Sequence, residues 1–184
     1  MTEKASDIIY SGPRFVIEKK EYTLPDGTPK QGIVISPHDA VAIMPVSKDR
    51  CFLLKQYRFP IDEYIYEVPA GGIEQGETPD EAAHRELIEE TGFSARQLRS
   101  HGWIYLAPGY STERLWLYEA SDLIPSDSHK KDEDEIIEVV ELDICEMLSM
   151  IREGDIVDAK TIALAMLCFG ARHAASPPCR GEAK

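Results

Sequence analysis

Residues 71–93 read GGIEQGETPDEAAHRELIEETGF, and this stretch predicts a helix with clear signals at both ends. Thr78 is a suitable N-cap, and Glu81 completes a T-x-x-E capping box with it. Gly92 stands where helices commonly end on a left-handed residue. We therefore expect a helix over about 78–91.

The two faces of this helix differ in chemistry when residues are placed at 100° intervals. The face predicted to be buried holds Ala83, His84, Leu87, Ile88 and Thr91. The opposite face holds Ala82, Arg85, Glu86, Glu89 and Glu90. Glu86 and Glu90 form a like-charge i,i+4 pair, which costs about 0.2–0.5 kcal/mol. Glu89 and Glu90 also face the negative end of the helix dipole.

A divalent cation would remove this electrostatic penalty. Carboxylates that converge from one helical face offer the hard oxygen ligands that suit Mg²⁺ or Mn²⁺. Charge alone does not decide the matter, because a solvated acidic face would give the same pattern.

The wider spacing pattern favours the metal site. Nine residues fit G-x5-E-x7-R-E-U-x-E-E-x-G-U, where U is bulky and apolar: Gly71, Glu77, Arg85, Glu86, Leu87, Glu89, Glu90, Gly92 and Phe93. This pattern resembles the Nudix box, the signature of the Nudix hydrolases. The resemblance implies a loop–helix–loop that holds metal ions against a diphosphate.

By position, the resemblance implies a role for each polar residue of the box. Glu86 and Glu90 become the main metal ligands, and Glu89 an auxiliary ligand with a part in catalysis. Arg85 becomes the residue that orients the glutamates, and Glu77 a partner that steadies the helix. Gly71 and Gly92 are expected to be structural, since glycine permits tight backbone turns.

The rest of the chain predicts strands mixed with helices. Strands are expected within 14–36 (a hairpin) and at 40–47, 51–57, 64–70, 98–108, 113–120 and 136–143, with further helices at 144–153 and 158–172 and an acidic loop over 121–135. This order predicts a layered α/β domain with a mixed sheet. The resemblance specifies an α/β/α sandwich of Nudix type with a small N-terminal antiparallel β region.

Sequences flanking the box are similar to the ADP-ribose pyrophosphatase branch of the family: KQYRFP (55–60), YEVPAGGIEQGE (66–77), APGYSTE (107–113), KDEDEIIEV (131–139) and EGDIVDAKTIALA (153–165). This likeness implies that residues 1–38 form a β region exchanged between the two protomers of a homodimer. Residues 39–173 would be the catalytic domain, and 174–184 a flexible tail.

The same likeness implies further site residues. The backbone carbonyl of Ala70 would be a metal ligand, and Arg58 would contact the substrate phosphates. Glu133 aligns with a general base on a late acidic loop, and Glu135 is the alternative base. The loop PGYSTE adds Gly109 and Glu113 as candidate substrate contacts.

The aromatic residues available to stack a base differ from those of eukaryotic relatives. Eukaryotic members of the branch stack adenine on N-terminal tryptophans, whereas Trp103 and Trp116 lie downstream of the box. Tyr10, Phe15 or Tyr22 are the aromatic candidates in the N-terminal region. A strict preference for adenine is therefore in doubt, and a hydrolase of GDP-mannose or of several nucleoside diphosphate sugars stays open.

Composition limits the partners. A formal net charge of −13 over 184 residues argues against binding to long nucleic acid, which requires clustered Lys and Arg. No secretory signal, membrane-length apolar run or C-x-x-C pair is visible, so we expect a cytoplasmic protein that does not enter a membrane.

We therefore expect a Mg²⁺-dependent pyrophosphatase, with Mn²⁺ as a possible substitute. It would cleave ADP-ribose or a related nucleoside diphosphate sugar into a nucleoside monophosphate and a sugar phosphate. The alternatives are a sanitiser of oxidised nucleoside triphosphates and a nucleotide sensor without catalysis. The complete set of carboxylates argues against the sensor.

Overall fold

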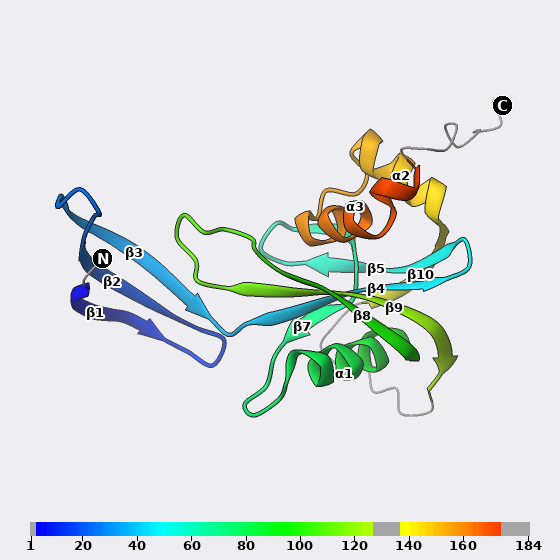
Figure 1. The fold of residues 1–184 in the computed structure, drawn as a ribbon, viewed down its shortest axis with the longest axis horizontal. Helices are drawn as coiled ribbons and strands as arrows, with labels where there is room; N and C mark the ends of the chain where they lie inside the picture. The colour runs from blue at the N-terminus through cyan, green and yellow to red at the C-terminus, as the bar shows by residue number, and fades with distance from the viewer. Residues whose placement is uncertain (1–2, 127–136, 174–184) are drawn as a thin grey trace.

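A small sheet precedes the main body of the protein. The computed structural model describes residues 3–126 and 137–173. Strands β1 (Glu3–Ser11), β2 (Phe15–Thr23) and β3 (Pro29–Pro37) form an antiparallel sheet in the order β1-β2-β3. Figure 1 shows this sheet standing to one side of the molecule.

A seven-stranded sheet forms the centre of the protein, with β10-β5-β4-β9-β8 as its main path, β6 beside β5 and β7 beside β4. Its strands are β4 (Ala40–Ser47), β5 (Arg50–Arg58), β6 (Glu63–Glu67), β7 (Ala70–Gly72), β8 (Phe93–Tyr105), β9 (Arg114–Pro125) and β10 (Ile137–Asp143). The β4–β9 pair is parallel and the other pairs are antiparallel, so the sheet is mixed.

Helices cover both faces of this sheet. Helix α1 (Pro79–Thr91) lies on one face, and α2 (Ile144–Glu153) and α3 (Ala159–His173) lie on the other (Figure 1). Alternation along β4 supplies both cores: Val41 and Ile43 pack on the α1 side, and Ala42 and Met44 pack on the α2–α3 side. The expected α/β/α arrangement with a mixed sheet and an N-terminal antiparallel region is confirmed.

Two strands are longer than predicted. Strand β8 begins at Phe93, directly after the helix, and β9 continues to Pro125, whereas we expected 98–108 and 113–120. The added segments pair with each other, with Phe93 opposite Pro125. Their polar residues obscured the pattern, because β8 is an edge strand and one side of it faces water. Strand β1 was also not predicted.

The small sheet is joined to the main body through backbone hydrogen bonds. The Ile35 N–H donates to the Tyr110 carbonyl at 2.8 Å, and the Thr112 N–H donates to the Ile35 carbonyl at 3.1 Å. Strand β3 therefore reaches the loop between β8 and β9.

Among the described residues, no helix has the length and apolarity needed to cross a membrane.

Candidate active site

Helix α1 begins and ends as its sequence predicts. The Thr78 hydroxyl accepts from the Glu81 N–H at 3.3 Å, and the Glu81 carboxylate accepts from the Thr78 N–H at 2.9 Å. Gly92 takes the left-handed conformation, with φ 74°. These local interactions fix the bounds of the helix and hence the spacing of its glutamates.

The predicted faces of α1 are wrong at two positions, because Ala82 is buried and His84 is exposed. The cause is the packing of α1 against β7 as well as against β4 and β8. The glutamate-bearing face is therefore turned toward β7 and is only partly open to water.

Arg85 holds three carboxylates and a carbonyl. Its Nε and Nη2 donate to the two carboxylate oxygens of Glu77, each at 2.9 Å. Its Nη1 donates to Glu86 at 2.7 Å and to Glu89 at 3.0 Å, and Nη2 also donates to the Gly72 carbonyl at 2.9 Å. Hydrogen bonding to Glu77, followed by that to Glu86, raises the pKa of Arg85, so it stays charged.

Glu77 also fixes the loop before the helix. Its Oε2 accepts from the Glu74 N–H at 2.9 Å. The hydrogen bonds from Arg85 hold the pKa of Glu77 below its usual value despite partial burial. Glu77 thus stays ionised and connects the loop to Arg85.

Two of the helix glutamates meet the backbone of β7. Glu90 Oε2 accepts from the Ala70 N–H at 2.8 Å. The Glu86 carboxylate lies so close to Gly71 that a Cβ there would sit 1.9 Å from Glu86 Oε1. Glycine is therefore the one residue type at position 71 that leaves room for the Glu86 carboxylate. Burial raises the pKa of Glu86 even though Arg85 opposes the shift.

These groups line a cavity of about 540 Å³, where the small sheet meets the main body. This volume suits a nucleotide-sized ligand. Its charged lining residues are Arg14, Arg58, Glu86, Glu89, Glu90 and Glu113. Residues 70–72 and Phe15 also line it.

Arg58 is held at the cavity by a buried carboxylate that sequence reasoning missed. Its Nε and Nη2 donate to Glu67 at 2.5 and 2.8 Å, and the Lys160 ammonium also contacts Glu67. Burial alone would raise the pKa of Glu67, but Arg58 and Lys160 together bring it below its usual value. The sequence signal for Glu67 is a charged residue at a position of the alternating segment YIYEVPA that is expected to be buried.

The candidates on later loops are placed differently. Glu113 lines the cavity, and burial, reinforced by Asp39, raises the pKa of its carboxyl. Gly109 lies in the turn from Ala107 to Tyr110 and is not among the residues that line the cavity. Glu133 and Glu135 fall outside the described residues.

The aromatic candidates lie in different parts of the structure. Phe15 lines the cavity, and the ring of Tyr10 lies 5.4 Å from the Phe15 ring between centroids. Tyr22 lies at the other end of β2, opposite Lys30. Trp103 and Trp116 are on β8 and β9, paired with each other across the two strands.

The residues present fit a hard divalent cation. The Glu86, Glu89 and Glu90 carboxylates all line the cavity, and two of them contact the backbone at residues 70–71. Arg85 donates to Glu86 and Glu89, and the three carboxylates carry more negative charge than this one guanidinium offsets. Oxygen donors with excess negative charge are the ligands that Mg²⁺ and Mn²⁺ prefer.

Comparison with known proteins gives consistent matches. A family model described as NUDIX domain matches residues 36–164. An ADP-ribose pyrophosphatase of Bacillus subtilis (strain 168) is 33% identical over 159 residues, covering 85% of this chain and 86% of that protein. A methanol dehydrogenase activator of Bacillus methanolicus is 35% identical over 156 residues, covering 84% of both chains. A solved structure titled "Crystal structure of ADP compounds hydrolase" matches with a TM-score of 0.83 and 25% identity, covering 95% of each chain.

Proposed function

Because the chain belongs to the NUDIX family, we propose that it is a pyrophosphatase that hydrolyses the diphosphate linkage of nucleoside diphosphate sugars, with ADP-ribose as the leading substrate. Water adds to one phosphorus atom, and the products are a nucleoside monophosphate and a sugar phosphate. The observation that carries this proposal is the convergence of Glu86, Glu89 and Glu90 on one cavity with the backbone of β7.

Nudix hydrolases generally use divalent metal ions, and we propose Mg²⁺, with Mn²⁺ as a substitute. Glu86, Glu90 and the Ala70 carbonyl would hold the ion, with Glu89 as an auxiliary ligand. When bound, the ion supplies neutralisation of the charge on the diphosphate oxygens. Arg85 keeps the carboxylates oriented through the hydrogen bonds that it donates to Glu86 and Glu89.

Residues on other elements would bind the two ends of the substrate. Arg58 and Arg14 line the cavity and offer guanidinium groups for the phosphates. Phe15, backed by Tyr10, offers a ring on which a base can stack. A stacking ring accepts any base, so this arrangement agrees with a broader substrate range than ADP-ribose alone.

The general base stays a prediction from the resemblance. Glu133, with Glu135 as the alternative, is proposed to take the proton from the attacking water. Glu113 is proposed to contact the substrate from the β8–β9 loop, because its carboxylate lines the cavity. The neighbouring Gly109 is retained as a proposed backbone contact.

A homodimer is proposed as the working form. The small sheet exposes Ile8 by 67%, Ile9 by 58% and Ile33 by 50%, and large exposed apolar side chains support an interface in this region. Residues 1–38 would form this interface and 39–173 the catalytic domain. The expected cytoplasmic location stays a prediction.

The test is a substrate panel incubated with Mg²⁺, with products separated by chromatography. ADP-ribose, ADP-sugars, GDP-mannose and nucleoside triphosphates each enter as separate reactions. A monophosphate and a sugar phosphate from ADP-ribose, at the highest kcat/KM of the panel, is the expected result. Release of inorganic pyrophosphate from triphosphates at a higher kcat/KM would instead select a sanitiser. Binding without any product would select a nucleotide sensor.

A further inference from the structure

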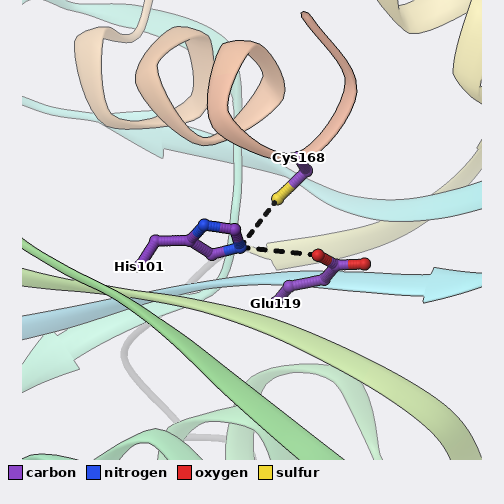
Figure 2. A group of neighbouring side chains, drawn as sticks. All are labelled: His101, Glu119 and Cys168. Atoms are coloured by element: carbon purple, nitrogen blue, oxygen red, sulfur yellow. Dashed lines mark hydrogen bonds and ion pairs between the residues drawn. The ribbon is translucent and has the colours of Figure 1, made fainter. Parts of the chain in front are cut away.

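Three potential metal ligands meet on the face of the main sheet opposite α1. His101 comes from β8, Glu119 from β9 and Cys168 from α3. Figure 2 shows the Cys168 thiol directed from the helix toward the His101 ring, with the Glu119 carboxylate beside the same edge of the ring. Cys168 is on α3, which Figure 1 shows on the face of the sheet opposite α1, the helix that carries the glutamates of the cavity.

The nitrogen-to-oxygen distance in the cluster is long for a hydrogen bond. His101 Nε2 lies 3.4 Å from Glu119 Oε2 and 3.7 Å from Cys168 Sγ, and the three ligand atoms all lie within 4.8 Å of one another. A typical N–H···O bond is about 2.9–3.0 Å. In a tetrahedral zinc site, Zn–N, Zn–O and Zn–S bonds of about 2.0–2.3 Å place N and O roughly 3.3 Å apart and N and S roughly 3.5 Å apart. The two distances from His101 Nε2 are close to those of a tetrahedral ligand set, and the Cys168–Glu119 pair, within 4.8 Å, would have to shorten to about 3.5 Å.

The arrangement does not suit nucleophilic catalysis. In a Cys–His–carboxylate triad, the nucleophile contacts one ring nitrogen and the carboxylate contacts the other. Here both Cys168 and Glu119 approach Nε2. Three potential ligand atoms within 4.8 Å of one another are compatible with metal coordination after a small adjustment of the side chains.

Burial and charge support the same interpretation. The side chains of His101 and Glu119 are 10% and 11% exposed, and Cys168 is buried. Within the described part of the chain, the contacts of the Glu119 carboxylate are His101 and the exposed Arg99, whose Nη1 is 4.0 Å away. A carboxylate at this depth, with partners 3.4 and 4.0 Å away, would be stabilised further by a cation at bonding distance. A divalent cation, one thiolate, one carboxylate and a neutral imidazole sum to zero charge.

We propose that His101, Glu119 and Cys168 form a zinc site separate from the catalytic cavity, with water as the fourth ligand. The Cys168 thiol loses its proton to solvent as the Zn–S bond forms. The distance between Cys168 Sγ and the Glu119 carboxylate shortens when the ion binds. Thiolate and imidazole favour Zn²⁺, whereas the oxygen donors of the catalytic cavity favour Mg²⁺, so the two sites select different ions.

The site would fix α3 on the sheet. At the start of α3, the Thr161 hydroxyl accepts from the Val68 N–H at 2.9 Å, and Lys160 contacts Glu67. Cys168 follows Thr161 by about two helical turns and therefore lies on the same face. Zinc would fix the later part of α3 to the sheet, just as the contacts of Thr161 and Lys160 fix its beginning.

Cobalt substitution tests this proposal directly. Metal-free protein, with excess Mg²⁺ present to occupy the catalytic carboxylates, is titrated with CoCl₂ and then with ZnCl₂. We expect one Co²⁺ per chain with a thiolate-to-cobalt charge-transfer band, which disappears when Zn²⁺ displaces it. Cys168→Ala should abolish this band. Cys51→Ala is the matched control, because Cys51 is a buried free cysteine that contacts Met147 and is outside the cluster.

A second readout does not depend on thiol spectroscopy. ZnCl₂ should raise the thermal midpoint of the wild type and of Cys51→Ala by several degrees, and should not raise that of Cys168→Ala. Glu119→Gln should weaken zinc binding by at least about tenfold, as loss of an anionic ligand requires. Absence of the charge-transfer band in the wild type would overturn the proposal, and so would a band of equal strength in Cys168→Ala. Both outcomes are independent of whether the protein hydrolyses nucleotides.

Discussion

Arg58 binds Glu67 through two parallel hydrogen bonds, 2.5 Å from Nε to Oε1 and 2.8 Å from Nη2 to Oε2. Glu67 is 2% exposed, and Lys160 contacts it from α3. One buried carboxylate therefore connects a wall of the cavity to a helix on the far face of the sheet. This connection places a guanidinium at the cavity with a fixed orientation.

Glu67→Gln should destabilise the protein by about 3 kcal/mol at neutral pH, because it removes the buried carboxylate shared by Arg58 and Lys160 and leaves Lys160 to pair with Asp158 at 3.0 Å. Urea denaturation measures the change. Glu141→Gln is the control, since Glu141 pairs with Arg50 where the side chains are 52% and 45% exposed, and such pairs contribute less than about 1 kcal/mol. An equal loss in both variants would contradict the role of the buried carboxylate.

The same variant should change the acid dependence of stability. The pKa of Glu67 is lower in the folded protein than its usual value of 4.5, so the unfolded state binds more protons between the two values. Its stabilising contribution is therefore complete above about pH 4.5 and is lost as the pH falls through the folded pKa. We expect the difference between the urea midpoints of the wild type and Glu67→Gln to narrow as the pH falls below 4.5. A constant difference from pH 7 to pH 3 would contradict this.

Gly71→Ala should reduce kcat by about 100-fold or more, because the new Cβ displaces the Glu86 carboxylate and displacements near 1 Å have effects of this size. The side chain of Glu86 can move, so the free energy of unfolding should change little. Gly72→Ala is the matched comparison, since its Cβ would meet nothing within 4 Å, and it should lose far less activity. Equal losses in the two variants would show that the Gly71–Glu86 contact is not the cause.

Glu90→Gln should lower kcat at least about 100-fold while preserving the fold. The amide oxygen can still accept from the Ala70 N–H, and removal of a negative charge near the helix C-terminus is favourable. Steady-state kinetics and thermal denaturation check the two parts. Glu146→Gln, an exposed change on α2, is the control. Turnover like that of the wild type in Glu90→Gln would refute the proposed metal ligand.

Ile8→Asp should convert the proposed dimer to a monomer, because a charge at this exposed apolar position would be buried in the proposed interface. Size-exclusion chromatography with light scattering measures the mass. Val157→Asp changes a side chain with similar exposure, 60%, between α2 and α3, and should leave the mass unchanged. A wild type that is monomeric at all concentrations would remove the basis of the interface.

The sequence by itself determined α1, because its caps and its glutamate spacing depend on residues within one or two turns of one another. Thr78 and Glu81 cap each other and Gly92 ends the helix without help from the rest of the chain. The pattern from Gly71 to Phe93 was therefore enough to predict the family, and the alternation of buried strands was enough to predict the layered fold.

Only the tertiary structure decided which distant groups meet. Burial of Ala82, exposure of His84 and the close approach of Glu86 to Gly71 follow from the way α1 packs on β7. Glu67 and Lys160 are brought together from strand and helix across 93 positions of sequence. The cluster of His101, Glu119 and Cys168 likewise depends on the register of the sheet and on the position of α3 against it. Contacts of this kind arise from packing over the whole domain, and no short stretch of sequence encodes them.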